Sequence, residues 1–526
     1  METLSVGIDG SCDRTAPTKT VAFGTAPSIL LVYSMHELSR SVLFFGKSFM
    51  SQSNVGLGQN PPGASPPPYS GWQAAIAQYF DFEHYQTSFR TEILAGLTTF
   101  MTMAYILVVH PIIMSDAVFL TESGDLFREL IVVTGLTAVI GTLVMGLYAK
   151  YPFVLAPGMG TNAFFAYSVV LGLGIDWRVA MACVLIEGLI FIALTITDIR
   201  RHLIAAVPSC IKASTTVGIG MFLAYIGLSS ATEIGGAGLI VANEVTKTAF
   251  GSFREPATLL ATFGIFISAM FLIRRIKGAL LWGIAGTAIL GWVLGVATPP
   301  SGIVAMPVFP SHLFGQAFVG LSGINGNNII DFVAVLLVFL FVDMFDTIGT
   351  LMGVGTQAGY IDNKGELPRA NQALSADAIA TTAGALLGTS TVSTIAESAS
   401  GVAEGGRTGF TAVIAAGMFL LALLFVPIFE AIPAFATAPA LLIVGVLMMS
   451  SVSSIRWNDL TEAIPAFVTM FFIPLGFSIA AGLSAGLILY PFTKAISGRA
   501  REVSVITWAL AIVFVIRFVF TTLRFG

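Results

Sequence analysis

One apolar stretch, residues 331–355, constrains this chain more than any other, because it is long enough to cross a membrane and carries two aspartates. Asp343 and Asp346 interrupt a run of valine, leucine and phenylalanine. A carboxylate at bilayer depth costs about 2.5–3.5 kcal/mol on insertion scales, so it rarely lacks a function. Two carboxylates three residues apart share one helix face. The pair therefore predicts a polar cavity inside a bundle of membrane helices.

The composition indicates an all-α polytopic membrane protein. Of the 526 residues, 56% are hydrophobic and only 10% are charged, whereas soluble domains carry about 25% charged residues. The 54 glycines and 23 prolines suit close helix packing and broken helices. Short alternating strands, as in a β-barrel, are absent, and no basic run indicates nucleic-acid binding. The three scattered cysteines predict neither a disulfide framework nor a metal site.

Fourteen spans are predicted within a transporter domain at residues 89–496, from apolar runs of about 20 residues. They lie near residues 91–113, 127–148, 153–171, 177–197, 207–229, 257–273, 278–296, 330–353, 372–388, 390–405, 408–428, 436–451, 463–479 and 480–496. An N-terminal extension, residues 1–75, is expected to be largely disordered, because residues 51–70 are rich in proline, glycine and serine. Residues 503–526 are expected to form a C-terminal apolar helix and tail.

The distribution of basic residues predicts a cytoplasmic N-terminus. With that orientation, the cytoplasmic loops hold most of the lysines and arginines, whereas the external loop at residues 298–328 has none. This asymmetry agrees with the positive-inside rule. The basic residues on the cytoplasmic side are Lys150, Arg200, Arg201, Arg274, Arg275, Lys277, Lys364, Arg369, Arg407, Arg456, Lys494, Arg499 and Arg501.

The fourteen spans divide into two halves of seven, and because seven is odd, the second half is inverted relative to the first. A weak internal match supports this division. Pro208 is followed twelve residues later by Gly220 in span five, and Pro433 by Gly445 in span twelve. Inverted repeats are typical of secondary transporters.

Span three predicts a broken helix. Pro152 and Pro157 bracket a segment suited to extended backbone, and Pro157 suits the first turn of a helix. The helix that follows is too short to span a membrane alone. Gly160 allows close approach of another backbone, and Thr161 and Asn162 lie in the first turn.

Span ten predicts a second half-helix. Small and hydroxyl residues, including Thr394, precede a short helix with Glu397 in its early part, at the same relative place as Asn162. In an inverted repeat two such half-helices meet near the repeat axis, where their free N–H groups and positive dipole ends define a site. Non-helical backbone at this depth is tolerated where it lines a cavity.

Structural alternatives remain open for these residues. The two aspartates could form a network with polar groups of span one such as Thr102 or Tyr105. Glu397 could cap its half-helix, since a carboxylate is stabilised near a helix N-terminus. Capping is as plausible as binding for Asn162. Asp377 is expected to be a helix-start residue of span nine.

The chemistry of these side chains indicates what the cavity holds. Ionised carboxylates accept hydrogen bonds, so Asp346 and Glu397 suit a neutral ligand that bears several N–H donors, such as the edge of a nucleobase. Anions fit badly because the carboxylates would repel them. A buried acid is also readily neutralised, which makes these groups suited to proton coupling.

Three motifs then resemble a known family. They are APGMGTNAFF at residues 156–165, FVDMFDTIGTLMGVG at 341–355 and GTSTVSTIAESASGVAEGGRTG at 388–409. The chain from about residue 89 to the end of span fourteen resembles the AzgA-like purine permeases of the nucleobase–ascorbate (xanthine/uracil) transporter superfamily. Many members have Asn where this chain has His110, which ends span one and is expected at the membrane interface.

The resemblance implies a core domain (about residues 91–197 and 330–428) and a gate domain (about 207–296 and 436–496). It also implies proton symport of adenine, guanine and hypoxanthine by an elevator-like displacement of the core, without cofactor, metal or catalytic residue. A homodimer is common for this fold. The partners are then a purine nucleobase, protons and membrane lipid, and the plasma membrane is the expected location.

By the same resemblance, Asp346 and Glu397 contact the purine, Asp343 serves coupling or gating, and the backbone near Gly160 and Thr394 adds hydrogen bonds. The implied substrate-binding residues are Asn162, Asp346, Glu397, Gly160, Thr161 and Thr394, and the implied proton-coupling residues are Asp343, Asp346 and Glu397.

Three other functions compete with this interpretation. An anion exchanger of the sulfate-permease type would share the fold, but neutral or basic residues are expected at its half-helix mouths, and Glu397 argues against it. A membrane-embedded aspartate hydrolase would normally bring its acids from two helices, whereas Asp343 and Asp346 lie three residues apart on one. A channel agrees less well with broken helices in inverted repeats.

Overall fold

The computed structural model describes residues 69–196, 207–229, 236–324, 329–361 and 367–525. The predicted N-terminal extension lies outside the described residues as far as residue 68. Helix α2 (Trp72–Tyr79) begins just before residue 75, the predicted end of this extension. The C-terminal apolar segment forms helix α21 (Val505–Phe525).

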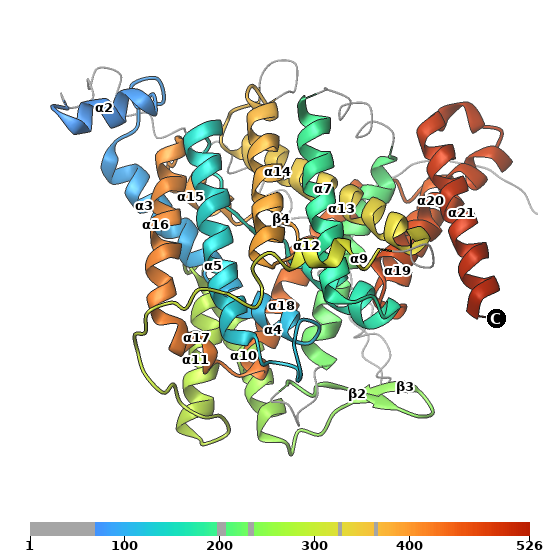
Figure 1. Cartoon of the computed structure of the whole chain (residues 1–526), viewed down its shortest axis with the longest axis horizontal. Coiled ribbons are helices and arrows are strands. Elements are labelled where there is room, and N and C mark those ends of the chain that lie inside the picture. Colours follow the sequence, from blue (N-terminus) through green and yellow to red (C-terminus); the bar gives the residue numbers. More distant parts are fainter. Residues whose placement is uncertain (1–68, 197–206, 230–235, 325–328, 362–366, 526) are drawn as a thin grey trace, which may run out of the picture. The chain divides into compact units, whose positions relative to one another are not determined.

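Helices make up most of the described residues (Figure 1). The α-helices between the two already named are α3 (Phe89–Met103), α4 (Ile106–Ser115), α5 (Phe127–Val144), α6 (Met159–Ala163), α7 (Trp177–Ile196), α9 (Ser209–Ser229), α10 (Pro256–Ile273), α11 (Ala279–Val293), α12 (Gln316–Leu321), α13 (Ile329–Gln357), α14 (Ala370–Leu387), α15 (Ser398–Ala403), α16 (Gly409–Ala422), α17 (Val426–Glu430), α18 (Ala434–Met448), α19 (Leu460–Leu475) and α20 (Ile479–Ile496).

Shorter elements complete the fold. The π-helices are η1 (Met145–Ala149) and η2 (Phe164–Gly172), and the 3-10 helices are η4 (Leu423–Phe425), η5 (Met449–Ser454) and η6 (Ala500–Glu502). The strands are β1 (Leu155–Pro157), β2 (Ile240–Asn243), β3 (Lys247–Phe250) and β4 (Val392–Thr394). Strands β2 and β3 form an antiparallel hairpin, which the sequence interpretation did not anticipate.

The chain is a multi-pass membrane protein. Nine helices of the described residues are long and apolar enough to cross a membrane, and α11, α19 and the first part of α21 are shorter apolar helices. Each of the fourteen predicted spans overlaps helical structure, and spans three and ten each begin with a short strand before the helix. The helix after the break in span three continues as a π-helix, η2, which the sequence interpretation did not foresee.

Two contacts relate the halves of the chain in the way an inverted repeat requires. Helices α9 and α18 pack closely at the two glycines that the internal match pairs. A Cβ atom on Gly220 would lie 2.8 Å from the carbonyl oxygen of Gly445, and one on Gly445 would lie 2.4 Å from that of Gly220. This reciprocal approach of the two backbones explains why residues 220 and 445 are both glycine. The second contact is the antiparallel pairing of β1 with β4.

Glu92 of α3 fastens that helix to the start of α16, which runs beside it together with α5 (Figure 1). The fully buried carboxylate accepts six hydrogen bonds. The amide N–H groups of Arg407, Thr408 and Thr411 donate three of them. The Thr411 amide also donates to the carbonyl of Thr408, at 3.2 Å. The carboxylate therefore supplies the acceptor for the amides of Arg407 and Thr408, at the helix start where backbone donors have no partner within the helix.

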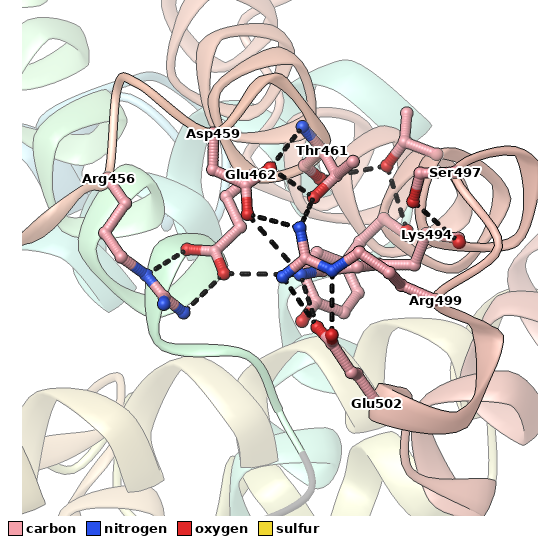
Figure 2. A network of polar contacts seen from close by, with 10 residues as sticks. Arg456, Asp459, Thr461, Glu462, Lys494, Ser497, Arg499 and Glu502 are labelled. Atoms are coloured by element: carbon pink, nitrogen blue, oxygen red, sulfur yellow. Dashed lines mark hydrogen bonds and ion pairs between the residues drawn. The ribbon is translucent and has the colours of Figure 1, made fainter.

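An ion cluster joins the start of α19 to the end of α20 and to η6 (Figure 2). The fully buried Lys494 ammonium lies 2.9 Å from Glu502, 3.5 Å from Glu462 and 3.8 Å from Asp459. Arg499 contacts Glu502 and Asp459, each at 2.7 Å. Hydrogen bonds from Arg499 and Lys494 lower the pKa of Glu502 to about 2. Glu502 therefore stays ionised at neutral pH.

Candidate functional site

Two strand-and-helix units cross inside the helical bundle. Strand β1 pairs antiparallel with β4, with Ala156 opposite Ser393 at the centre of the register. The backbone N–H of Gly158 donates to the carbonyl of Thr391 at 3.1 Å, which extends the pairing. All six strand residues are buried. Helices α6 and α15 follow the two strands, so the predicted half-helices do start from one crossing.

Gly158 brings the two units close together. A Cβ atom at this position would lie 2.9 Å from the Ser393 hydroxyl and 3.8 Å from the Asp346 carboxylate. The Ser393 hydroxyl in turn donates a hydrogen bond of 3.1 Å to Asp346 Oδ2. Asp346 of α13 therefore lies directly against the crossing, where a side chain at residue 158 would leave too little room.

Glu397 also lies beside the crossing, between strand β4 and helix α15. It immediately precedes α15, and its Oε1 atom accepts a hydrogen bond of 2.7 Å from the hydroxyl of Tyr105. Tyr105 lies at the interruption between α3 and α4. Glu397 and Asp346 are close enough to interact electrostatically. Both are partly exposed, so the crossing presents two accessible carboxyl groups.

The two aspartates of α13 differ in environment. Asp343 is 1% exposed, whereas Asp346, less than one turn further along, is partly exposed. The two residues lie on the same helix, but only Asp346 of the two is partly exposed. Asp346 is thus positioned to meet a ligand, and Asp343 is packed inside the protein.

The other predicted binding residues are mostly enclosed. Asn162 is fully buried, and its carboxamide oxygen lies 3.5 Å from the Ser390 hydroxyl. The Thr161 hydroxyl bonds to the carbonyl of Gly158 at 3.1 Å. Thr394 bonds to Asp377 through its amide, at 3.0 Å. Gly160 is partly exposed and packs on the side chain of Ile219 in α9.

The predicted equivalence of Asn162 and Glu397 is wrong. Glu397 directly precedes its half-helix, whereas Asn162 is inside α6, which begins at Met159. The strand register also sets Asn162 further from the crossing than Glu397, because Ala156 lies opposite Ser393. The two side chains therefore do not occupy matching places in the two halves.

Two further expectations are wrong for a similar reason. Asp377 does not start its helix: α14 begins at Ala370, and Asp377 is fully buried, accepting hydrogen bonds from Thr394 and Thr347. His110 is not interfacial. It is fully buried, with Nδ1 2.9 Å from the Thr134 hydroxyl and Nε2 2.9 Å from the Thr389 hydroxyl.

The sequence interpretation missed the partners of the two accessible carboxyls. Ser393 bonds to Asp346, and Tyr105 bonds to Glu397 rather than to an aspartate. An isolated tyrosine in an apolar span gave a hint that a polar partner was present. Its identity could not follow from the spacing, because Tyr105 and Glu397 are 292 residues apart.

Two cavities of the described residues are lined by residues outside this crossing. One, of about 340 Å³, adjoins the ion cluster and is lined partly by Lys212, Arg456 and Glu502. The other, of about 500 Å³, is lined partly by Asp176 and Asp331. Among the described residues no group of three histidine, cysteine, aspartate or glutamate side chains could hold a metal ion.

Comparison with known proteins places these motifs in a family. Residues 90–485 match the model described as "Permease family". A Methanocaldococcus jannaschii protein named as a permease is 51% identical over 445 residues, covering 85% of this chain and 98% of that protein. The guanine/hypoxanthine permease PbuG of Bacillus subtilis is 41% identical, covering 84% and 99%. The adenine permease AdeP of Escherichia coli is 39% identical, covering 85% and 97%.

Solved structures support the fold. The transmembrane domain of a cyanobacterial bicarbonate transporter, BicA, matches with a TM-score of 0.52 at 16% identity and covers 75% of this chain and 98% of that chain. At that identity the likeness concerns the fold alone.

Proposed function

This chain belongs to the permease family, and we propose that it imports purine nucleobases across a membrane in symport with protons. One observation carries the proposal. Asp346 and Glu397 come from two separate elements and meet, partly exposed, at the crossing of the two strand-and-helix units. A membrane protein retains carboxyls at such a place when they bind or move something.

The chemistry of the two carboxyls supports a purine substrate. An ionised carboxylate only accepts hydrogen bonds, and a purine presents several N–H donors along flat edges. Ser393 and Tyr105 each donate to one oxygen of their carboxylate, which leaves acceptor capacity for a ligand. Relatives that are 39–41% identical carry guanine, hypoxanthine or adenine in their names.

The remaining predicted residues take supporting roles in this proposal. The partly exposed backbone at Gly160 and the extended backbone at Thr394 would offer hydrogen-bonding groups to the ligand, whereas the side chains of Thr161 and Asn162 would hold the half-helix in place. Asp343 would serve proton coupling behind Asp346, since it is buried on the same helix. Protonation of one acid removes the cost of a buried charge and permits the site to move.

We further propose the elevator mechanism with a core and a gate domain. Helices α3, α5, α7, α14 and α16 pack among themselves, as do α9, α10, α18, α19 and α20. Contacts between the proposed domains include the pairing of Lys277 with Glu404 at 2.7 Å and the approach of the Lys212 ammonium to 5.2 Å from the Phe345 ring centre. These contacts would break and re-form as the core moves. The basic cytoplasmic loops support a cytoplasmic N-terminus in the plasma membrane.

The fold alone would also suit an anion exchanger, since BicA carries bicarbonate by its name. The accessible carboxyls Asp346 and Glu397 argue against that function, because an anion beside them would be repelled. A neutral ligand with N–H donors fits the same groups.

Uptake of radiolabelled hypoxanthine and adenine, in a host that lacks purine permeases, tests the proposal. We expect uptake to fall as external pH rises from about 5 to 8, and to be lost in Glu397→Ala. Glu244→Ala, in the exposed loop between β2 and β3, is the matched control and should transport normally. Equal uptake at both pH values, at matched membrane potential, would argue against proton coupling. Normal uptake by Glu397→Ala would overturn the site.

A further inference from the structure

A third buried carboxyl lies behind the proposed site. Glu187 is near the middle of α7, between Trp177 and Ile196, and is fully buried. Arg178, at the start of the helix, is the only other charged residue of α7. A carboxyl at this depth is costly to keep, so its retention calls for a role.

Glu187 contacts Thr391, the residue just before β4. Its Oε2 atom accepts a hydrogen bond of 3.2 Å from the Thr391 hydroxyl. The carbonyl of the same residue, Thr391, accepts from the amide of Gly158 at 3.1 Å. Glu187 is therefore linked, through Thr391, to the backbone hydrogen bond that joins the two crossing units.

The second oxygen of Glu187 is unusual. Oε1 is buried and has no hydrogen-bond partner among the described residues. A buried polar atom left without a partner costs about 1–3 kcal/mol, and more when it is charged. Helix α7 packs closely on α14 beside Glu187, since a Cβ atom on the neighbouring Gly188 would lie 2.5 Å from the hydroxyl of Thr382.

A second buried carboxyl faces the first. Asp377 of α14 interacts electrostatically with Glu187, as does the Cys183 thiol of α7 itself. Asp377 holds Thr394 through its amide, while Glu187 holds Thr391. Asp377 is thus bonded to the last residue of β4, and Glu187 to the residue just before the strand. Two carboxylates so placed in a dry interior repel each other, and a shared proton relieves that repulsion.

We propose that Glu187 is a proton-coupling residue that holds a proton in this conformation and releases it when the segment around Thr391 shifts. The inference rests on the proposed symport. The proton leaves the Glu187 carboxyl for water that reaches it in the shifted state and is replaced from the other side of the membrane; no other bond changes. Glu187 does not touch the substrate, and it acts through Thr391 on the strand pairing.

Glu187→Gln tests this inference, because glutamine keeps the volume and a hydrogen bond to Thr391 but cannot release a proton. In proteoliposomes, we expect accumulation of labelled hypoxanthine driven by a pH gradient to fall at least tenfold. Exchange of labelled for unlabelled hypoxanthine at equal pH should persist. Glu430→Gln, at the exposed end of α17, is the matched control and should leave both activities unchanged.

The inference would be overturned if Glu187→Gln accumulated hypoxanthine along the gradient as wild type does and had the wild-type pH profile. A merely structural role of Glu187 predicts that result. If the variant does not fold, Thr391→Val decides, because it removes the hydroxyl that favours the ionised carboxyl. We then expect the pH profile of uptake to move to higher pH by about one unit, and an unmoved profile would refute the role. Failure of wild type to carry hypoxanthine would instead refute the proposed function.

Discussion

Replacement of Glu92 by alanine offers a test of the packing that positions the half-helices. The variant removes the acceptor of six hydrogen bonds, five of which join α3 to the start of α16 and one of which comes from Thr87. The three hydroxyl donors can rotate toward other acceptors. The amides of Arg407 and Thr408 cannot, because the backbone that leads into α16 fixes them, whereas the Thr411 amide keeps its bond to the Thr408 carbonyl.

The magnitude follows from the amides of Arg407 and Thr408. A buried donor left without an acceptor costs about 1–3 kcal/mol, so for two amides even the lower value gives a loss of about 2 kcal/mol in the free energy of unfolding. The amide of Thr411 also loses a favourable interaction between the carboxylate and the start of its helix, worth about 0.3–1 kcal/mol. Alanine itself adds no local cost, because it is the best helix former.

Denaturant unfolding of the purified protein in detergent micelles, followed by tryptophan fluorescence, measures this loss. Glu83→Ala is the control, because Glu83 is exposed and lies only nine residues earlier. The free energy of unfolding of Glu92→Gln should lie between those of Glu92→Ala and Glu83→Ala. One side-chain oxygen remains as an acceptor in this variant, but the new NH₂ group faces hydrogen-bond donors. A Glu92→Ala protein within about 0.5 kcal/mol of wild type, the range typical of surface substitutions, would refute the reasoning.

Three further predictions follow from other contacts. Tyr105→Phe removes the 2.7 Å hydrogen bond to Glu397; at about 1.5–3 kcal/mol for a bond to a charged group, the KM for purine uptake should rise roughly 10- to 150-fold, and an unchanged KM would disprove the role of the tyrosine. Because the pKa of Glu502 is lowered to about 2, first by Arg499 and then by Lys494, its stabilising contribution is complete above the ordinary glutamate pKa near 4.5 and is lost as pH falls toward 2. Arg499→Gln should therefore reduce stability at pH 7 more than at pH 3, and an equal reduction at both pH values would contradict this. Gly220→Ala should destabilise the protein by about 1–3 kcal/mol through overpacking against α18, and wild-type stability would show that the two helices can separate at no cost.

Much of the fold was predictable because membrane helices are specified locally. A run of about 20 apolar residues must form a helix that satisfies its own backbone, so the predicted spans overlap helices throughout the described residues. The breaks were also predictable, since Pro157 and the hydroxyl-rich run before Glu397 do not continue a helix. The matched glycines Gly220 and Gly445 pointed to a repeat before their contact was visible.

The partners within the site were not predictable, because they are distant in sequence. Ser393 and Asp346 are 47 residues apart, and Tyr105 and Glu397 are 292 apart. No local pattern sets such a pair; the antiparallel pairing of β1 with β4 does. The same pairing fixes that Asn162 and Glu397 occupy different places in the two halves.

The sequence by itself determined that this protein crosses a membrane many times, where its helices break, and which acids lie at membrane depth. Only the tertiary structure decided the surroundings of each acid. Asp343 and Asp346 are alike in sequence, yet the first is buried and the second is partly exposed beside Ser393 and Gly158 of the crossing. The physical reason is that helical periodicity assigns a residue to a face, whereas its exposure depends on what distant parts of the chain pack against that face.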